Sequence, residues 1–358
     1  MADRTNQRAG DNSQQMIIEH YHAGITEERA AAIADERAKL AIEQYTAEAA
    51  PIAHERIQKF DQKLVRDLAH EELLNAFADP AFLGVVQRAQ INAASTERES
   101  DYDLLSKLVT QRAKDKDRYV AATVQKAVDI VHLIDETALI GLTVTWMTYV
   151  SRPMSGEVAS GLAVLEDTFA TFPLDDLPTG QQWLNHLDTL DAVRLSQLGP
   201  LTKYSTYLSS RLPGYLSKGF TREQGSAINA QVAEIRPNWH FELLQHEFNP
   251  DLLRLNHANS IDIDEILEKD ESLGEEQRAS LVRIAKADGH IDEIDETYRP
   301  AFEAAIDSHS NLRKLRAWWD QIPVGFDIAS CGHALAYVAA QQYHPLGHLQ
   351  PFDEFLRA

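Results

Sequence analysis

The sequence predicts a mainly α-helical protein: a helical bundle with long N-terminal amphipathic helices, a small Gly/Pro-rich mixed subdomain and a C-terminal helical region. Apolar residues recur at helical spacing up to about residue 150, prolines and glycines crowd into residues 173–225, and helical patterns resume at Thr221. We therefore expect a polar tail at 1–24, a helical bundle at 25–150, a helix plus small mixed subdomain at 151–225, and an acidic C-terminal helical region at 226–358.

The polar tail lacks apolar periodicity, and residues 14–18 are an edge-strand alternative within it. Strong helix formers follow from Thr26 to about Ala50, and Pro51 is expected to begin a second helix. The first helix has a sparse apolar stripe made of Ile33, Leu40, Ala41 or Ile42, and Tyr45. The second has a regular stripe made of Ile52, Ile57, Phe60, Leu64, Leu68 and Leu73.

These two helices need partners, because an isolated helix with so little apolar surface is not stable in water. One arrangement is a helical hairpin that packs on the rest of the same chain. The other is association with a second copy, since an apolar stripe with charged flanks is typical of helix-mediated oligomers. We expect a homo-oligomer that forms through the N-terminal helices.

Further helices are predicted on both sides of the bundle boundary. Asp79-Pro80 is expected to begin one helix, and two buried helices are expected to meet near Asp135. The uncharged stretch 137–150 is too short to span a bilayer, which needs roughly 20 apolar residues. Later segments are predicted as a helix at 157–172, a helix at 181–190, a strand at 193–198, and a buried strand or short helix at 326–340.

Composition excludes several classes of protein. The 34 basic and 55 acidic residues give a net charge of −21, which argues against a nucleic-acid or membrane-surface partner. The single cysteine, Cys331, excludes an intrachain disulfide framework and suits a reducing cytoplasm. The first 24 residues also lack the uninterrupted apolar stretch of a secretory signal. We therefore expect a cytoplasmic protein.

One acidic segment is a candidate metal site. Asp288, Asp292 and Asp295 are closely spaced, with Gly289 to turn the chain, and carboxylate oxygens are the ligands that Ca²⁺ and Mg²⁺ prefer. The spacing is not that of an EF-hand. The alternative is an ordinary Asp-Gly turn, in which Asp292 caps the next helix. Residues 259–307 carry 15 acidic and 5 basic side chains, which would attract a divalent cation or a basic protein, or form a solvated helix face.

The sequence has no motif for nucleophilic catalysis or phosphate binding. Gly-x-Ser-x-Gly, the P-loop and the dinucleotide-binding glycine pattern are all missing. We accordingly assign no catalytic residues and expect no cofactor apart from the divalent cation just described.

Two resemblances add to this. Gly10-Asp11-Asn12-Ser13, Gly24-Ile25-Thr26 and the string Leu-Pro-Gly-Tyr-Leu-Ser-Lys-Gly-Phe-Thr at 212–221 resemble a family of uncharacterised bacterial proteins. That resemblance implies a bacterial, cytoplasmic and mostly helical protein, and it supplies no catalytic residues. Ala287-Asp288-Gly289 also resembles the turn between helices of tellurite-resistance B-like domains, where nearby acidic residues are implicated in metal binding.

Three functions follow as hypotheses. The preferred one is a non-enzymatic, self-associating interaction or sensor protein of a bacterial stress or phage-defence system, with a protein as its partner. The first alternative is a divalent-metal-binding protein or metal-dependent hydrolase that uses the segment from Asp288 to Asp295. The second is a small-molecule receptor whose pocket lies between the bundle and the Gly/Pro-rich subdomain.

Overall fold

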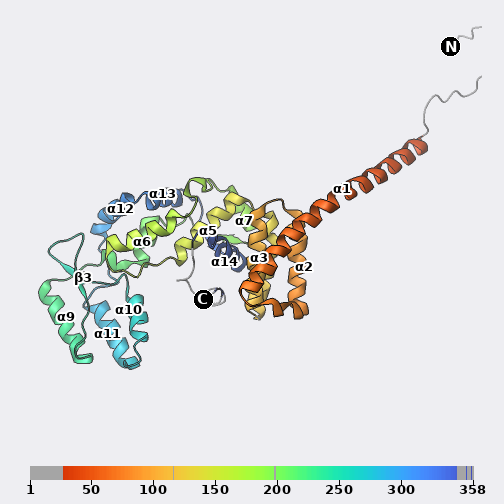
Figure 1. The fold of residues 1–358 in the computed structure, drawn as a ribbon. Helices are drawn as coiled ribbons and strands as arrows, with labels where there is room; N and C mark the ends of the chain where they lie inside the picture. Colours follow the sequence, from red (N-terminus) through yellow and green to blue (C-terminus); the bar gives the residue numbers. More distant parts are fainter. Residues whose placement is uncertain (1–26, 116, 197–198, 345–351, 353–355, 357–358) are drawn as a thin grey trace, which may run out of the picture. The chain divides into compact units, whose positions relative to one another are not determined.

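The computed structural model describes residues 27–115, 117–196, 199–344, 352 and 356 (Figure 1). Contacts divide the chain into two compact units, residues 1–55 and residues 56–358. The predicted polar tail and its edge-strand alternative at 14–18 lie outside the described residues.

The prediction of a mainly α-helical fold is confirmed. The described residues form fourteen α-helices, four strands of three residues each and several short 3-10 helices. The α-helices are α1 (Glu27–His70), α2 (Pro80–Ser95), α3 (Glu99–Lys114), α4 (Arg118–Ile130), α5 (Glu136–Val150), α6 (Val158–Ala170), α7 (Gln182–Thr189), α8 (Tyr204–Arg211), α9 (Arg222–Ile235), α10 (Ser260–Glu268), α11 (Glu275–Ala287), α12 (Arg299–Ser308), α13 (Ser310–Trp319) and α14 (Ser330–Ala340). The strands are β1 (Val193–Leu195), β2 (Leu243–Gln245), β3 (Leu253–Leu255) and β4 (Phe326–Ile328).

The expected break at Pro51 is wrong, because α1 runs through it as one helix. A proline inside a helix costs about 3 kcal/mol, since it removes one backbone hydrogen bond and crowds the preceding turn. Two features offset that cost. Residues before Pro51 are strong helix formers, and after it Phe60, Leu64 and Leu68 are at most 1% exposed in the core of the second unit.

Local signals in the sequence account for the starts of several other helices. Asp79, Asp117 and Asp135 each accept a backbone N–H from the first turn of the helix that follows, which satisfies donors that have no partner within the helix. Asp135 lies between α4 and α5, so the predicted meeting of two buried helices there is confirmed. No described helix is both long and apolar enough to cross a membrane, and the very apolar α5 has only 15 residues.

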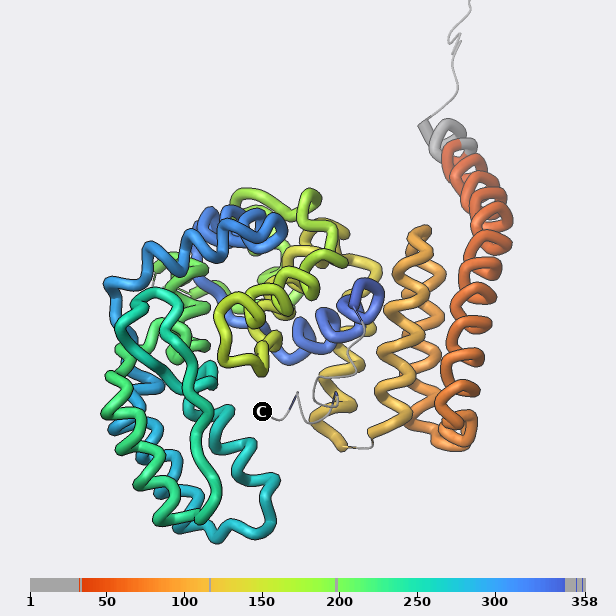
Figure 2. The backbone as a smooth tube through the Cα atoms, turned by 60° about the vertical axis from the view of Figure 1, so that its left-hand side comes forward, coloured from red at the N-terminus to blue at the C-terminus, as the bar shows by residue number. Residues whose placement is uncertain are grey.

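The last helix completes the core of the bundle. α14 packs against α3, α4 and α5, although it comes from the far end of the sequence (Figure 2). Most of its residues are buried and apolar, and many of them are alanines, as expected for a helix surrounded by protein. The preceding strand β4 pairs antiparallel with β1, with Val193 opposite Ile328. The 326–340 segment therefore contains both of the alternatives expected for it, a short strand followed by a buried helix.

A second hydrophobic cluster lies around α9, α10, α11 and the β2–β3 hairpin. The string at 212–221 joins this cluster to the larger core, and nearly all of its residues are buried. Gly214 donates its N–H to the carbonyl of Ala258 at 2.7 Å, and Phe220 exchanges backbone hydrogen bonds with Leu253. Thr221 then caps α9 in a capping box with Gln224. The most specific sequence string of this chain is therefore a packed junction.

Candidate ligand-binding cleft

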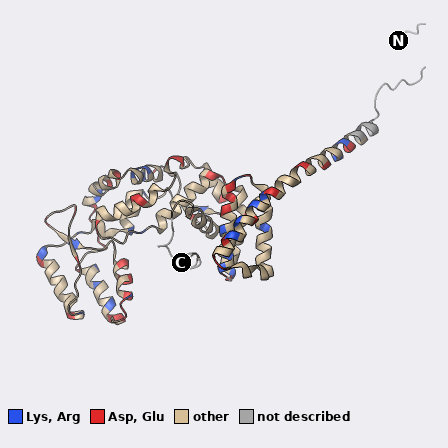
Figure 3. Ribbon diagram, viewed as in Figure 1, with Lys and Arg blue, Asp and Glu red and all other residues tan. Residues whose placement is uncertain are grey.

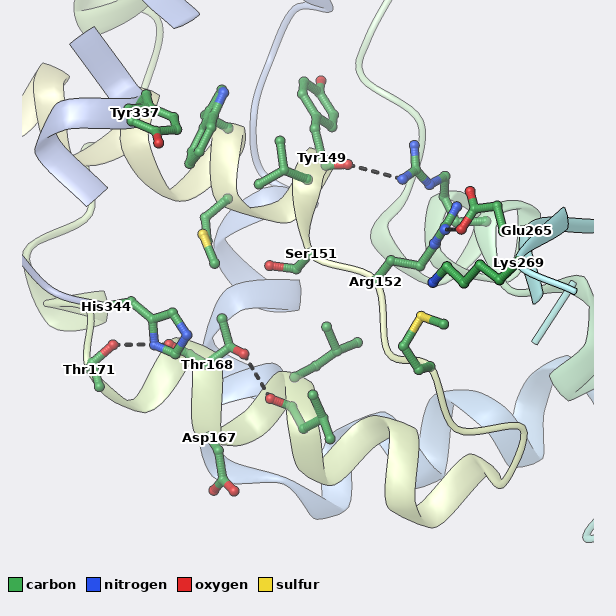
Figure 4. Close-up of a pocket in the computed structure, with 17 residues that line it drawn as sticks. Tyr149, Ser151, Arg152, Asp167, Thr168, Thr171, Glu265, Lys269, Tyr337 and His344 are labelled. Atoms are coloured by element: carbon green, nitrogen blue, oxygen red, sulfur yellow. Dashed lines mark hydrogen bonds and ion pairs between the residues drawn. The ribbon is translucent and has the colours of Figure 1, made fainter. Parts of the chain in front are cut away.

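A cleft of about 1090 Å³ lies beside the C-terminal end of α5, within the second unit (Figure 4). It is formed by the end of α5, the linker that follows, one face of α6, the ends of α8 and α10, α14 and the residues after α14. The lining residues are Trp146, Met147, Tyr149, Val150, Ser151, Arg152, Met154, Val164, Leu165, Asp167, Thr168, Thr171, Arg211, Glu265, Lys269, Tyr337 and His344. Five separate parts of the sequence thus meet at one concave surface.

The linker after α5 carries Arg152, one of the charged residues that line the cleft. Ser151 ends α5 in an extended conformation, and Pro153 prevents Arg152 from continuing the helix. Arg152 reaches α10, where its Nε lies 3.1 Å from the Asp262 carboxylate and its Nη2 lies 2.5 Å from that of Glu265. Asp262 is only 1% exposed, and burial raises the pKa of its carboxyl even though Arg152 opposes the shift. Arg152 is therefore held in place by two carboxylates.

Two other cations line the same end of the cleft with fewer partners. Arg211 donates from Nη2 to the carbonyl of Tyr149 at 3.1 Å, and its side chain is otherwise exposed. Lys269, just after α10, is exposed, and its ammonium group has no hydrogen bond or ion pair with any described residue. Both charges are thus available to a bound molecule.

The middle of the cleft is apolar. Trp146, Met147 and Leu165 form buried parts of its wall, whereas Met154 and Val164 expose 56% and 50% of their surfaces at it. Two buried polar atoms at the cleft, Ser151 Oγ and His344 Nδ1, have no hydrogen-bond partner among the described residues. A buried polar group without a partner is uncommon and calls for an explanation. Apolar walls with a few polar groups are the usual composition of a small-molecule site.

The three predicted metal-ligating residues accept hydrogen bonds from different parts of the chain. Asp288 ends α11 and accepts a long hydrogen bond, 3.3 Å, from Gln231. Asp292 accepts from both the backbone N–H and the hydroxyl of Ser260, at 3.0 and 2.6 Å, and so caps α10 from across the chain. Asp295 caps the 3-10 helix that follows it. No group of three or more metal-ligating side chains is found among the described residues.

The turn in this acidic segment also differs from expectation. Gly289 was expected to supply the turn, but the residue in the left-handed region is His290, with φ of 50°. Gly289 is instead needed for close packing, because a Cβ there would lie 2.7 Å from the carbonyl oxygen of Ala285 and from Leu255 Cδ1. Helix α10 carries acidic residues and no basic ones, whereas the acidic residues of α11 lie in its first turn and basic residues follow them (Figure 3).

The N-terminal part of α1 presents a second candidate surface. Ile42, Tyr45 and Ile52 are 65%, 67% and 52% exposed, and with the exposed Ala49 they repeat at spacings of three and four residues. We call these four residues the α1 stripe. Leu40 is exposed as well, but it lies about 160° away from Ile42 around the helix, outside the stripe.

The residues of the cleft are not marked by any motif in the sequence. Arg152 was recognised only as part of a break after the bundle, and Arg211 and Lys269 carry no motif. The one useful signal was the expectation that a pocket forms where the bundle meets the Gly/Pro-rich segment, and the cleft is lined by residues from both.

Comparison with known proteins gives a family but no activity. A family model described only as ":-like" matches residues 24–344, so the chain belongs to that uncharacterised family, as the resemblance predicted. No curated protein matches the chain, and no solved structure does.

Proposed function

We propose that this protein is a non-enzymatic, self-associating interaction or sensor protein of a bacterial stress or phage-defence system, and that a second copy binds the α1 stripe. The observation that carries the proposal is the exposure of Ile42, Tyr45 and Ile52 on a helix whose later turns are buried. Residues three and four apart form the seam along which two helices pack. Cys331 is buried and is the single cysteine of the sequence, and a chain without a disulfide framework suits a cytoplasmic location.

Stability supports the same proposal. A helix that lacks tertiary contacts is marginal in water, and Pro51 weakens this one further. Burial of large apolar side chains against a second copy would supply the missing stabilisation, at roughly 25 cal/mol for each Å² removed from water.

The test is the mass of the protein in solution, measured by light scattering during gel filtration. The natural chain should elute as an oligomer, and Ile42→Asp with Tyr45→Asp should be monomeric. Leu40→Asp is the matched control, because it adds the same charge to the same helix outside the stripe. A monomeric natural chain, or dissociation by Leu40→Asp alone, would refute self-association through the stripe.

A second candidate function, a small-molecule receptor, is favoured by the cleft. The cleft is large enough for a ligand, contains polar atoms without partners among the described residues, and has two cations, Arg211 and Lys269, that form no ion pair with a described carboxylate, although the Arg211 charge also acts on the buried Asp262. The receptor and the self-associating protein are compatible, since a sensor needs both a ligand site and a means of passing the signal to another chain. The metal-dependent alternative has less support, because Asp292 and Asp295 already accept hydrogen bonds from the protein.

A further inference from the structure

We propose that the cleft binds a small amphipathic anion, a molecule with a carboxylate head and an acyl or aromatic body, with the head at Arg211 and Lys269. This inference rests on the receptor function proposed above and names the class of its ligand. It is independent of self-association through the α1 stripe.

The charges of the cleft favour an anion over a cation. Glu265 is paired with Nη2 of Arg152, and the buried Asp262 is paired with Nε of the same guanidinium group. Asp167 is the other carboxylate among the lining residues, and it points away from the cleft (Figure 4). A bound cation would therefore find no free carboxylate, whereas an anion would find both Arg211 and Lys269.

The negative charge of the rest of the chain makes Arg211 and Lys269 stand out as a site for anions. The protein carries a net charge of −21, so anions are repelled from most of its surface. Charge-assisted hydrogen bonds from an arginine and a lysine are roughly twice as strong as neutral ones, and they gain strength where apolar walls reduce the local dielectric constant. The head group would therefore be bound at this end of the cleft.

The apolar walls define the body of the ligand. In Figure 4 the labelled charged residues Arg152, Glu265 and Lys269 lie at one end of the cleft, and Thr171 and His344 lie at the other. Met154 and Val164, which are about half exposed, lie at the cleft together with Met147. An acyl chain or aromatic ring along this stretch would remove that apolar surface from water, and methionine side chains adapt readily to such shapes.

The two polar atoms without partners fit a ligand that carries oxygen. Ser151 Oγ can donate a hydrogen bond to a carboxylate or accept one from a hydroxyl group, and His344 Nδ1 can do either, according to its tautomer. A ligand with only an apolar surface would leave both atoms unsatisfied, which weakens its binding.

Isothermal titration calorimetry of the full chain tests the inference with three matched probes: octanoate, 1-octanol and octylammonium. Octanoate should bind at least tenfold more tightly than the other two. The double variant Arg211→Glu/Lys269→Glu should lose most of this affinity. The double variant Arg283→Glu/Arg313→Glu makes the same change in net charge at exposed positions away from the cleft, and it should bind octanoate as the natural chain does.

The possible outcomes distinguish failure of the receptor function from failure of the anionic class of its ligand. Equal binding of octanoate and 1-octanol, unchanged in the cleft variant, would refute the anionic class and leave the receptor function standing. Failure of all three probes to bind the folded protein would overturn the receptor function and the anion inference together. Circular dichroism of both double variants shows that they are folded, so a loss of binding can be assigned to the cleft.

Discussion

The cleft and the segment from Asp288 to Asp295 are both clusters of charged and polar groups, but they differ in how far the protein satisfies them. In the acidic segment, Asp292 and Asp295 each accept a backbone N–H and a hydroxyl group of the chain. In the cleft, Lys269, Ser151 Oγ and His344 Nδ1 have no partner among the described residues. Polar groups that are fully paired hold the fold together, whereas unpaired ones at a concave surface are available to a ligand.

The largest expected effect concerns Arg152, the one cleft cation that is fully paired. Arg152→Ala should lower the free energy of unfolding by about 3 kcal/mol, because it removes the ion-pair partner of the buried Asp262 carboxylate. Arg211→Ala, at an exposed side chain of the same cleft, should change it by less than about 0.5 kcal/mol. Urea unfolding of the two variants measures this difference.

A second change separates a structural role of Arg152 from a ligand-binding one. Adding Asp262→Asn to Arg152→Ala should restore part of the lost stability, because the buried charge is then gone. If Arg152→Ala is as stable as the natural chain, then Arg152 does not hold the fold together and belongs with the ligand-binding cations.

The next largest effect tests the acidic segment. Asp292→Ala should cost about 1–2 kcal/mol, because α10 loses a cap on its first turn and Ser260 loses two hydrogen bonds. Asp288→Ala is the control, since its one hydrogen bond, from Gln231, is long and exposed. Thermal unfolding followed by circular dichroism compares the two. Equal losses of stability in the two variants would show that the hydrogen bonds of Asp292 to Ser260 do not stabilise the fold.

The packed junction beside the acidic segment should make stability depend on pH. Burial lowers the pKa of His246, whose Nε2 donates to the Ser217 carbonyl while its Nδ1 accepts from the Phe248 N–H. The unfolded chain then binds more protons than the folded one below the ordinary pKa of about 6.5, so stability falls as the pH drops. Each such histidine contributes up to about 1.4 kcal/mol per pH unit.

His257 and His333 are partly buried, and this burial lowers the pKa of each. His246→Gln should therefore reduce the pH dependence between about pH 6.5 and 5.5 without removing it. Unfolding free energies of both proteins at these two pH values give the slope. An unchanged slope in His246→Gln would mean that this imidazole is not held neutral by the junction.

The smallest expected effect is that of divalent cations. Because the aspartates of the acidic segment are already paired, millimolar Ca²⁺ or Mg²⁺ should leave the melting temperature unchanged. A ligand that binds only the folded state must raise that temperature. A clear increase that Asp292→Asn abolishes would restore the metal-dependent alternative.

Much of the fold could be predicted, because the signals for it are local. Asp79, Asp135 and Thr221 are predicted helix starts that the structure confirms, and each acts on the turn that directly follows it. The break predicted at Pro51 is wrong, although a proline inside a helix does lower the stability of that helix. Core packing of later residues of α1 compensates for this loss, and the local sequence does not show that packing. The packing of α14 against α3, α4 and α5 was not predicted at all, since it joins segments from opposite ends of the chain.

The candidate site shows the same limit more strongly. Asp288, Asp292 and Asp295 were noticed because they are neighbours in the sequence, yet the fold directs them to different partners. Arg152, Arg211 and Lys269 are far apart in the sequence and meet only through the arrangement of α5, α8 and α10. Proximity along the chain predicts turns and caps well, whereas a pocket depends on tertiary contacts that no short pattern encodes.

Native mass spectrometry of the full chain with added octanoate tests most directly whether this protein is the proposed self-associating receptor. The account predicts a multiple of the 40.2 kDa chain, with one octanoate bound per subunit. In Ile42→Asp/Tyr45→Asp, the expected species is a monomer that still carries octanoate, because the cleft and the α1 stripe have no residue in common. A natural chain found only as a 40.2 kDa monomer without octanoate would contradict the account.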